Sequence, residues 1–278
     1  MSGPSSRPSG ALPASLTLVG AGKMGGAMLA GWLANGLDAA RTCVVDPQAS
    51  PETIRLCEIH GIALNPSDVP ANDALILAIK PQGLEGAAGL LDTLISPDTL
   101  VVSILAGKTI ADLRTRLPSA RAIVRAMPNL PASIGRGVTG AVASAEVAPA
   151  QHAQADALLK GVGTVEWLDD EALIDALTAV SGSGPAYVFL LAEAMAEAGV
   201  AAGLPADMAA RLARATVAGA GALLSTSPHE AGQLRRDVTS PGGTTAVALA
   251  VLMREGGVPD LMREAVEAAK VRAGELSG

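Results

Sequence analysis

A glycine-rich turn between a short apolar run and a helical segment constrains the fold of this chain most strongly. Residues 20–25 read Gly-Ala-Gly-Lys-Met-Gly, the pattern G-x-G-x-x-G, and they follow the apolar run 16–19. Where a strand turns into a helix, the first glycine permits the tight turn, the second lets the backbone approach a pyrophosphate, and the third lets helix and strand pack closely. The alternative is a glycine-rich turn without a ligand, but the strand–turn–helix setting favours a dinucleotide.

The alternation of strand and helix continues to about residue 165. Apolar, β-rich runs predict strands, and the amphipathic segments between them predict helices. The strands are expected at 16–19, 42–45, 74–79, 99–105 and 122–125, and helices between them at 24–35, 51–60 and 84–94. Thr109 and Asp112 have the spacing of a capping box. This alternation predicts βαβ units and a parallel sheet.

After about residue 167 the strand signals stop. Helices are expected at 171–180, 185–202, 206–224, 244–255 and 260–275, and Ser227-Pro228-His229-Glu230 predicts one more helix start with a capping box. The chain is therefore predicted as α/β, with a dinucleotide-binding domain at 14–166 and an all-helical domain at 167–278. Residues 1–13, rich in serine, proline and glycine, are predicted as a disordered tail. Small residues on several helix faces indicate either a subunit interface or a close-packed internal core.

Composition narrows the class of partner. Hydrophobic residues make up 49 % of the 278 and aromatic residues only 1 %, so the core must be built mainly from alanine, valine, leucine and isoleucine. A net charge of −7 without a basic block argues against nucleic acid. Two cysteines give neither a disulfide framework nor a metal spacing, and they fit a reduced cytoplasmic setting. Residues 1–13 lack the apolar core of a secretory signal, and the longest apolar run, 215–224, is too short for a bilayer, which needs roughly 20 residues.

The ends of the predicted strands supply candidate cofactor contacts, because ligands bind at the carboxyl edge of a parallel sheet. Asp46 ends the second strand, where an acidic residue binds the adenosine ribose hydroxyls and repels a 2′-phosphate. Its alternative role is to cap the turn before Pro47. Lys80 ends the third strand and either meets the cofactor or is simply solvated. Asn129, held between two prolines, is placed to offer its amide to a ligand, with a structural turn as the alternative.

Two further motifs lie in the helical half. Residues 237–245 read D-V-T-S-P-G-G-T-T. They predict a helix start in which Ser240 caps, Pro241 takes the first helical position, and two glycines leave the backbone amides bare. Bare N–H groups at a helix start bind anions, although the same residues also suit an ordinary turn. A second loop, S-G-S-G-P-A-Y at 181–187, is expected to open into another helix.

Beyond its tail, the whole chain resembles the pyrroline-5-carboxylate reductases. The resemblance is carried by the glycine fingerprint at 20–25, A-I-K-P at 78–81, R-A-M-P-N at 125–129, and the motifs at 181–187 and 237–245. The last two are specific to that family, whereas many dehydrogenases share the fingerprint. Three positions depart from the family pattern: Leu130 stands where threonine is usual, I-L-A at 104–106 replaces a commoner Ala-Ala pair, and a second arginine stands in 234–238 where an acidic residue is common. The last departure leaves the role of Asp237 open.

The resemblance implies an enzyme that reduces 1-pyrroline-5-carboxylate to L-proline, the last step of proline biosynthesis, with NADPH or NADH. It implies a Rossmann-like domain followed by a helical dimerisation domain, in a homodimer that can assemble further, up to a decamer. Related cyclic imines stay open as substrates. By motif, the cofactor would be held by Val19, Gly20, Ala21, Gly22, Lys23, Met24, Asp46, Ala78, Ile79, Lys80, Pro81, Ile104, Leu105, Ala106 and Asn129. The substrate would be held by Ser181, Gly182, Ser183, Gly184, Ser240, Gly242, Gly243, Thr244 and Thr245.

The scarcity of acid–base groups favours imine chemistry. The three histidines, His60, His152 and His229, lie outside the glycine motifs. Reduction of a ketone needs a positioned proton donor, whereas an imine can be protonated before it binds, and the iminium then accepts a hydride without a further proton. We therefore expect orientation of the reactants to dominate, with the Thr245 hydroxyl near the ring nitrogen as the catalytic candidate. The alternatives are a β-hydroxyacid-dehydrogenase-type oxidoreductase that uses a lysine such as Lys80, and a non-catalytic module that senses NAD(P)H.

Overall fold

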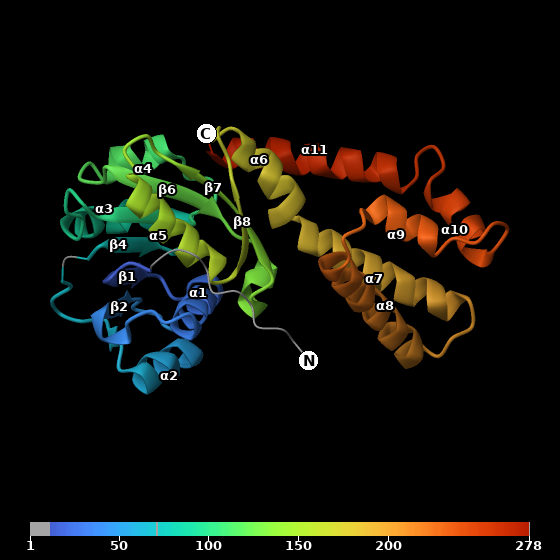
Figure 1. Cartoon of the computed structure of the whole chain (residues 1–278), viewed down its shortest axis with the longest axis horizontal. Helices are drawn as coiled ribbons and strands as arrows, with labels where there is room; N and C mark the ends of the chain where they lie inside the picture. Colours follow the sequence, from blue (N-terminus) through green and yellow to red (C-terminus); the bar gives the residue numbers. More distant parts are fainter. Residues whose placement is uncertain (1–11, 71, 278) are drawn as a thin grey trace. The chain divides into compact units, whose positions relative to one another are not determined.

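The structure is a computed structural model that describes residues 12–70 and 72–277 (Figure 1). The chain divides into two compact units. One, here called the sheet unit, reaches to Gly182 and also takes in the end of the chain from Lys270; the other, the helical unit, is Ser183–Ala269. The disordered tail expected at 1–13 lies, up to residue 11, outside the described residues.

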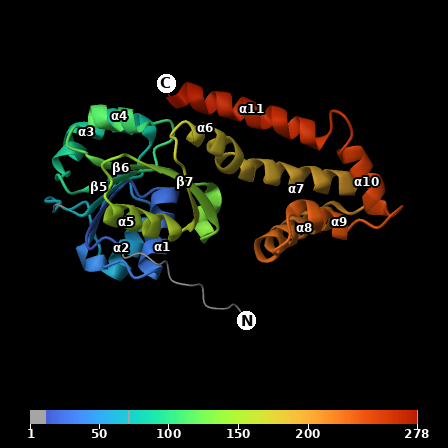
Figure 2. The same cartoon turned by 45° about the horizontal axis from the view of Figure 1, so that its top comes forward.

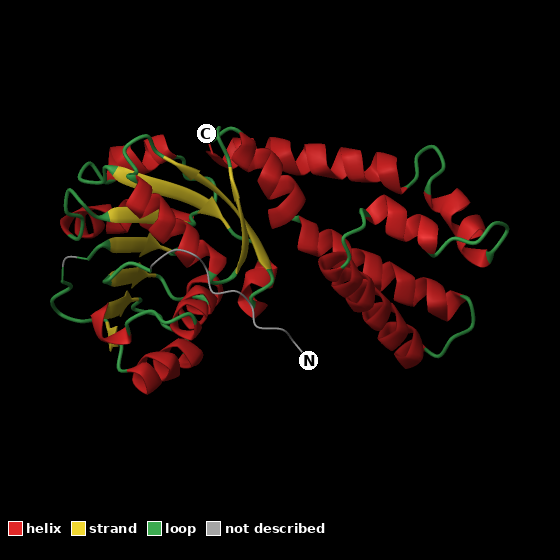
Figure 3. Ribbon diagram, viewed as in Figure 1, coloured by secondary structure: helices red, strands yellow, loops and turns green. Residues whose placement is uncertain are grey.

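The sheet unit is built on one sheet, which within the described residues has eight strands in the order β3-β2-β1-β4-β5-β6-β7-β8 (Figure 3). The strands are β1 (Leu16–Val19), β2 (Thr42–Val45), β3 (Ala63–Leu64), β4 (Ala74–Leu77), β5 (Leu100–Ser103), β6 (Ala122–Met127), β7 (Gly137–Ala143) and β8 (Gly163–Trp167). Neighbours from β3 to β6 pair in parallel, β7 runs antiparallel to β6, and β8 is parallel to β7. The predicted parallel sheet is therefore confirmed for the five strands that were expected. Strands β3, β7 and β8 were not predicted.

Helices cover both faces of this sheet (Figure 2). They are α1 (Lys23–Ala34), α2 (Pro51–His60), α3 (Leu84–Thr93), α4 (Ile110–Arg116), α5 (Pro149–Lys160) and α6 (Leu173–Leu177). The strands alternate between the faces: Ile76 of β4 joins the core under α1 and α5, and its neighbours Leu75 and Leu77 join the core under α3 and α4. Because β1, β4 and β5 are buried on both sides, their residues are mostly apolar, as is usual in parallel sheets.

Helices of the helical unit follow in chain order. They are α7 (Gly184–Ala201), α8 (Ala206–Thr226), α9 (Ala231–Asp237) and α10 (Thr244–Leu252); α11 (Val258–Ser277) begins in this unit and ends in the sheet unit. Helices α7 and α8 pack closely because small residues face each other: a Cβ at Gly199 would lie 3.2 Å from the Cβ of Ala209. Large apolar side chains such as Phe189, Leu190 and Val247 stay exposed in the single chain. The all-helical second half is thus confirmed.

The start of α9 differs from its prediction. The helix begins at Ala231 with Glu230 as the N-cap, instead of taking Ser227 as the cap and Pro228 as the first helical residue. The Ser227 hydroxyl accepts a hydrogen bond from the N–H of His229 at 3.1 Å. A hydroxyl that closes this tight local turn does not cap the third helical N–H, so the capping-box prediction was wrong.

The sequence predicted no segment long enough to span a bilayer, because its longest apolar run was 215–224. One helical run of the structure nevertheless has the length and composition of a membrane span. Within the described residues, Leu173–Ala201 is a continuous helical run of 29 residues, of whose most apolar window only 11 % is buried in the chain. Helices that pack in a core or against another subunit have the same composition, so this run is weak evidence for a membrane.

Candidate functional site

The carboxyl edge of the sheet brings the first group of predicted site residues together. Val19, Leu77 and Ser103 are register partners at the ends of β1, β4 and β5. The residues that follow are tied to the neighbouring strand. The N–H of Ala78 donates to Val19 O at 2.8 Å, that of Ile104 to Leu77 O at 3.0 Å, and that of Gly20 to Val45 O at 2.9 Å. Three motifs therefore begin side by side at this edge: the glycine fingerprint at 20–25, A-I-K-P at 78–81 and I-L-A at 104–106. They lie where the strand order reverses, between β1 and β4.

The three glycines of the fingerprint have three different surroundings. Gly20 is left-handed at φ 87°, and a Cβ there would lie 2.7 Å from the backbone of Ala78. A Cβ at Gly25 would lie 2.2 Å from the carbonyl oxygen of Gly20, whereas a Cβ at Gly22 would meet nothing within 4 Å. Gly20 and Gly25 are thus needed for packing, whereas Gly22 leaves the backbone open to a ligand. This cradle fits the pyrophosphate of a dinucleotide.

The start of α1 adds an electrostatic reason for the same ligand. Gly22 is the N-cap and offers no side chain to the first helical N–H groups, and the first turn holds no acidic residue. Unpaired N–H groups and the positive end of the helix dipole attract an anion. Lys23 is exposed here, while Val19 and Ala21 are buried. Val19 and Ala21 can therefore offer only their backbones to a ligand.

Asp46 lies between two backbone donors. Its Oδ2 accepts a hydrogen bond from the N–H of Ala21 at 2.7 Å, and its Oδ1 accepts one from Gln48 at 2.8 Å. The bond to Gln48 is the turn-capping role that the sequence left open. The bond to Ala21 holds the fingerprint turn against the end of β2. Contact with a ribose stays a prediction for this half-buried carboxylate.

The other edge residues differ in what they can offer. Lys80 is exposed and caps a short 3-10 turn, Pro81–Gly83. Ala106 is exposed and Ile104 half-buried, so both are accessible from solvent. Leu105 is only 2 % exposed and packs in the core under α3 and α4. A cofactor could therefore meet Leu105 through its backbone alone.

Asn129 is bound at both ends of its amide. The side chain is 8 % exposed; its Nδ2 donates to the carbonyl oxygen of Ser181 at 3.1 Å, and its Oδ1 accepts from the N–H of Val138 at 2.9 Å. These bonds give the structural role that was the alternative. A contact between this amide and a ligand stays a prediction.

The motif at 181–187 is not a loop, and that prediction was wrong. Residues Thr178–Gly182 form a π-helical turn that continues α6 into α7, and Ser183 is the N-cap of α7. Gly182 is closely surrounded: a Cβ there would lie 3.3 Å from Cγ2 of Thr178 and 3.4 Å from Cε of Met127. Single π turns inside helical runs are frequent at functional sites. Ser181 and Gly182 belong to the sheet unit, and Ser183 and Gly184 to the helical unit.

In the motif at 237–245 the helix begins at Thr244, as the expected range 244–255 has it, and not at Pro241, as the capping pattern predicts. Gly242 is left-handed at φ 70°, which breaks any helix started at Pro241, and α10 starts at Thr244 with Gly243 as its N-cap. Ser240 is therefore not the cap; its carbonyl oxygen accepts from the N–H of Gly243 at 3.0 Å. The N–H groups of Thr244 and Thr245 begin the helix, where no carbonyl of the preceding turn can accept them. The expected bare helix start is present in the helical unit.

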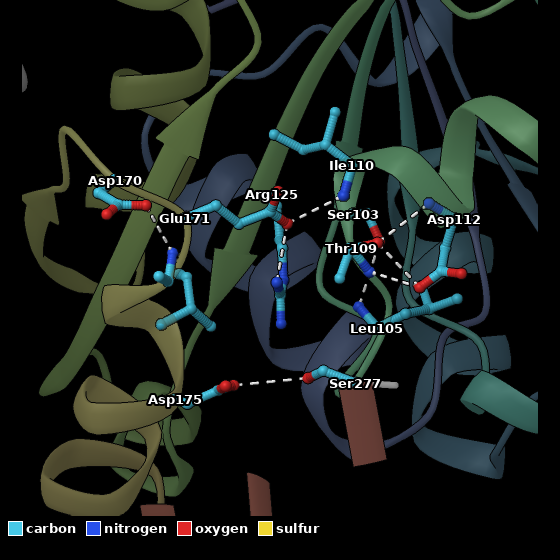
Figure 4. A network of polar contacts seen from close by, with 12 residues as sticks. Ser103, Leu105, Thr109, Ile110, Asp112, Arg125, Asp170, Glu171, Asp175 and Ser277 are labelled. Atoms are coloured by element: carbon cyan, nitrogen blue, oxygen red, sulfur yellow. Dashed lines mark hydrogen bonds and ion pairs between the residues drawn. The ribbon is translucent and has the colours of Figure 1, made fainter. Parts of the chain in front are cut away.

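A polar network at the end of β6 was missed in the sequence (Figure 4). The Arg125 side chain is 5 % exposed, and its Nη1 donates to Oε1 of Glu171 at 2.8 Å. The same oxygen accepts from the N–H of Ile110, the first residue of α4, at 2.9 Å. The only signal for it in the sequence is an arginine in an otherwise apolar strand.

The capping box that the sequence predicted at Thr109 is confirmed beside this network. The Thr109 hydroxyl accepts from the N–H of Asp112 at 3.0 Å, and the Asp112 carboxylate accepts from the N–H of Thr109 at 3.0 Å. Although partial burial acts to raise it, the hydrogen bonds from Thr109 hold the pKa of Asp112 below its usual value.

No metal site is built from the part of the chain that the structure describes: no three His, Cys, Asp or Glu side chains gather there to hold an ion. Cys43 and Cys57 are free thiols in buried positions, and burial raises the pKa of both. Neither thiol lies at the carboxyl edge.

A sheet whose strands β3 to β6 run parallel, with this glycine cradle at its carboxyl edge, is the architecture of a dinucleotide-binding protein. Residues 15–107 match a family model described as NADP oxidoreductase, coenzyme F420-dependent, and residues 171–276 match one described as pyrroline-5-carboxylate reductase dimerisation. The pyrroline-5-carboxylate reductase of Pseudomonas aeruginosa is 41 % identical over 264 residues, which cover 94 % of this chain and 96 % of the relative. This chain belongs to the pyrroline-5-carboxylate reductase family.

Solved structures agree with this assignment. A pyrroline-5-carboxylate reductase from Coxiella burnetii is 35 % identical with a TM-score of 0.88, covering 95 % of this chain and 99 % of that one. A pyrroline carboxylate reductase from Plasmodium falciparum, solved with NADP bound, is 26 % identical with a TM-score of 0.77, covering 95 % and 98 %. The resemblance and the fold class drawn from the motifs are confirmed.

Proposed function

We propose that this protein reduces 1-pyrroline-5-carboxylate to L-proline with NADPH or NADH, the last step of proline biosynthesis. The observation that carries the proposal is the glycine cradle at the carboxyl edge, in a chain that matches reductases of this name over 94 % of its length. The same coverage argues against the two alternative functions, a β-hydroxyacid-dehydrogenase-type oxidoreductase and a non-catalytic module that senses NAD(P)H.

The sheet unit would bind the dinucleotide, which would supply the hydride. The open backbone at Gly22 and the uncapped start of α1 would receive its pyrophosphate. Ala78, Ile104 and Ala106 would line the path of the cofactor along the strand ends. Asp46, once its oxygens are shared with the ribose hydroxyls, would favour NADH over NADPH by repelling a 2′-phosphate.

The helical unit would bind the substrate at the start of α10. The N–H groups of Thr244 and Thr245 would hold its carboxylate, and the N-cap Gly243 has no side chain that would stand in the way. The hydride forms the new C–H bond at the imine carbon, and the electron pair of the C=N bond moves to the ring nitrogen, which is protonated before the step. The hydroxyl of half-buried Thr245 would orient that nitrogen. The chain then needs no histidine at the site.

Dimers would form through the helical unit, and further assembly up to a decamer belongs to the same proposal. Exposed Phe189, Leu190 and Leu191 on α7 support an interface, because a monomer seldom leaves such neighbouring side chains in water.

We place the enzyme in the cytoplasm, free of membrane and nucleic acid, in accord with two free, buried thiols and an acidic net charge.

Oxidation of NADPH and of NADH, followed side by side with 1-pyrroline-5-carboxylate, tests the proposal. Loss of cofactor absorbance matched by proline, measured by mass spectrometry, is the expected result. Proline formation with neither cofactor would refute it. A run with a cyclic imine that lacks the carboxylate is the matched control, and it should turn over far more slowly if α10 holds that group.

A further inference from the structure

The last turn of α11 lies against the loop that follows β5. Gly107, at the apex of this loop, is left-handed at φ 70°. A Cβ at Gly107 would lie 2.5 Å from the carbonyl oxygen of Leu276 and 3.1 Å from its carbonyl carbon. Only glycine therefore lets the two backbones come so close. Both residues belong to the sheet unit, although about 170 positions separate them in sequence.

The same turn of α11 has a second attachment in this unit. The Ser277 hydroxyl donates to Oδ1 of Asp175 on α6 at 3.4 Å, and Figure 4 shows this pair beside Leu105 and Arg125. Between the turn and the strand ends lies a cavity of about 50 Å³, lined by Ala106, Arg125, Thr178 and Ala273 among others. This volume is too small for a dinucleotide, so we take it as a gap in the packing, not as a binding site.

The loop itself is held at its two ends. Near β5, the N–H of Leu105 donates to the hydroxyl of Ser103 at 3.3 Å. Near α4, the N–H of Ile110 donates to Glu171, and Thr109 is held in its capping box. Ile104, which is half-buried, and Ala106, which is exposed, lie in this loop, and the backbone of Leu276 supports it at Gly107.

We propose that the last turn of α11, Ala273–Ser277, positions the loop 104–107 for the dinucleotide. The proposal rests on the proposed function, because it takes this loop to be part of the cofactor path. Gly107 and Leu276 act as positioning residues: they face each other, and they set where Ile104 and Ala106 stand at the carboxyl edge. Displacing the loop would weaken cofactor binding, while the substrate motif at the start of α10 would be untouched.

A matched pair of glycines isolates this contact. Gly135 is also left-handed, at φ 68°, but a Cβ there would meet nothing within 4 Å. Gly107→Ala and Gly135→Ala therefore share the backbone strain, and only the first pushes against Leu276. Gly107→Asn and Gly135→Asn form a second pair in which the strain is smaller, because asparagine tolerates the left-handed region, so folding is retained.

The measurements are the Kd of NADPH and NADH by calorimetry, without turnover, and the melting temperature of each full-length variant. Gly107→Asn should weaken both dinucleotides about ten-fold relative to Gly135→Asn, because a backbone collision of this kind forces the loop to move. At saturating cofactor, the KM for 1-pyrroline-5-carboxylate should equal that of the wild type. Ser277→Ala should shift the Kd in the same direction by a smaller factor.

Two results would overturn the inference. One is equal dinucleotide affinity in the Gly107 and Gly135 variants. The other is a Gly107 variant that only melts earlier, which would make the contact a matter of stability alone. A wild-type protein that binds neither dinucleotide would instead refute the proposed function, and the inference with it.

Discussion

Separate replacements of the second and third fingerprint glycines by alanine should damage two different properties. In Gly25→Ala the new Cβ would stand 2.2 Å from the carbonyl oxygen of Gly20 and 3.2 Å from Cβ of Ala78. A backbone oxygen cannot swing aside, so the collision costs about 2 to 3 kcal/mol of folding free energy, the upper part of the range for overpacking. Alanine returns about 1 kcal/mol of helix propensity. A net loss of about 1 to 2 kcal/mol remains, which lowers the melting temperature by about 2 to 8 °C in a unit of this size.

In Gly22→Ala the same methyl group meets nothing within 4 Å, and the backbone there is at φ −66°, which alanine accepts. The melting temperature of the unliganded protein should therefore stay within about 1 °C of the wild type, since such surface changes cost under 0.5 kcal/mol. The methyl group instead stands where a pyrophosphate would approach, and the Kd for NADPH and NADH should rise about ten-fold or more.

Thermal melts without cofactor and calorimetric titrations with it separate the two effects. A melting temperature of Gly25→Ala equal to that of the wild type would refute the packing role of Gly25, since the helix and strand would then have space for the methyl group. An unchanged dinucleotide affinity in Gly22→Ala would likewise refute the ligand role of Gly22, because the open backbone would then serve no ligand.

Three further predictions follow from single contacts. Thr245→Val should lower turnover or substrate affinity while Thr245→Ser keeps both, and an unchanged Thr245→Val would remove the hydroxyl from the mechanism. Trp32→Phe should cost about 1 to 3 kcal/mol in urea unfolding, because the indole N–H that donates to Leu158 O at 2.7 Å is lost and a buried carbonyl is left unpaired. Asp112 has a folded pKa below its ordinary 3.8, so its contribution to stability is complete above that pH and is lost as the pH falls through the lowered value. The free energy of unfolding, measured between pH 2 and 6 (roughly, the window around that pKa), should therefore fall less steeply with decreasing pH in Asp112→Asn than in the wild type. Equal pH dependence in the two proteins would contradict this role of Asp112.

Local patterns were enough for the strands that lie in the middle of the sheet, and not for β7. Residues 16–19 and 42–45 are mostly apolar and mostly buried, and both strands have the bounds that the pattern predicts. Strand β7 reads G-V-T-G-A-V-A, which looks like a loop. A Cβ at its Gly140 would lie 2.2 Å from Cδ1 of Leu177, so a larger residue would have to displace that side chain. A packing partner 37 positions away, on α6, leaves no trace in a local pattern.

The same limit applies to the candidate site. The fingerprint and the Thr109 capping box depend on residues within a few positions of one another, and both could be read directly. Asn129 is bound by Ser181, 52 positions away, and Arg125 by Glu171, 46 positions away. Such partners decide whether a polar side chain is free for a ligand, and only the folded chain brings them together. The bare start of α10 was expected and the range 244–255 begins at the observed residue, but the left-handed Gly242 excludes the helical Pro241 that the capping pattern predicted.

The return of α11 into the sheet unit has a consequence for the order in which the protein is made. Strands β1 to β8 are complete once residue 167 has been synthesised, yet the residues that support Gly107 belong to 270–277. The loop at 104–107 therefore gains its last neighbour only after the whole helical unit, Ser183–Ala269, has been synthesised. A bulky group attached to Ser277 would stand next to the residue that supports this loop, Leu276.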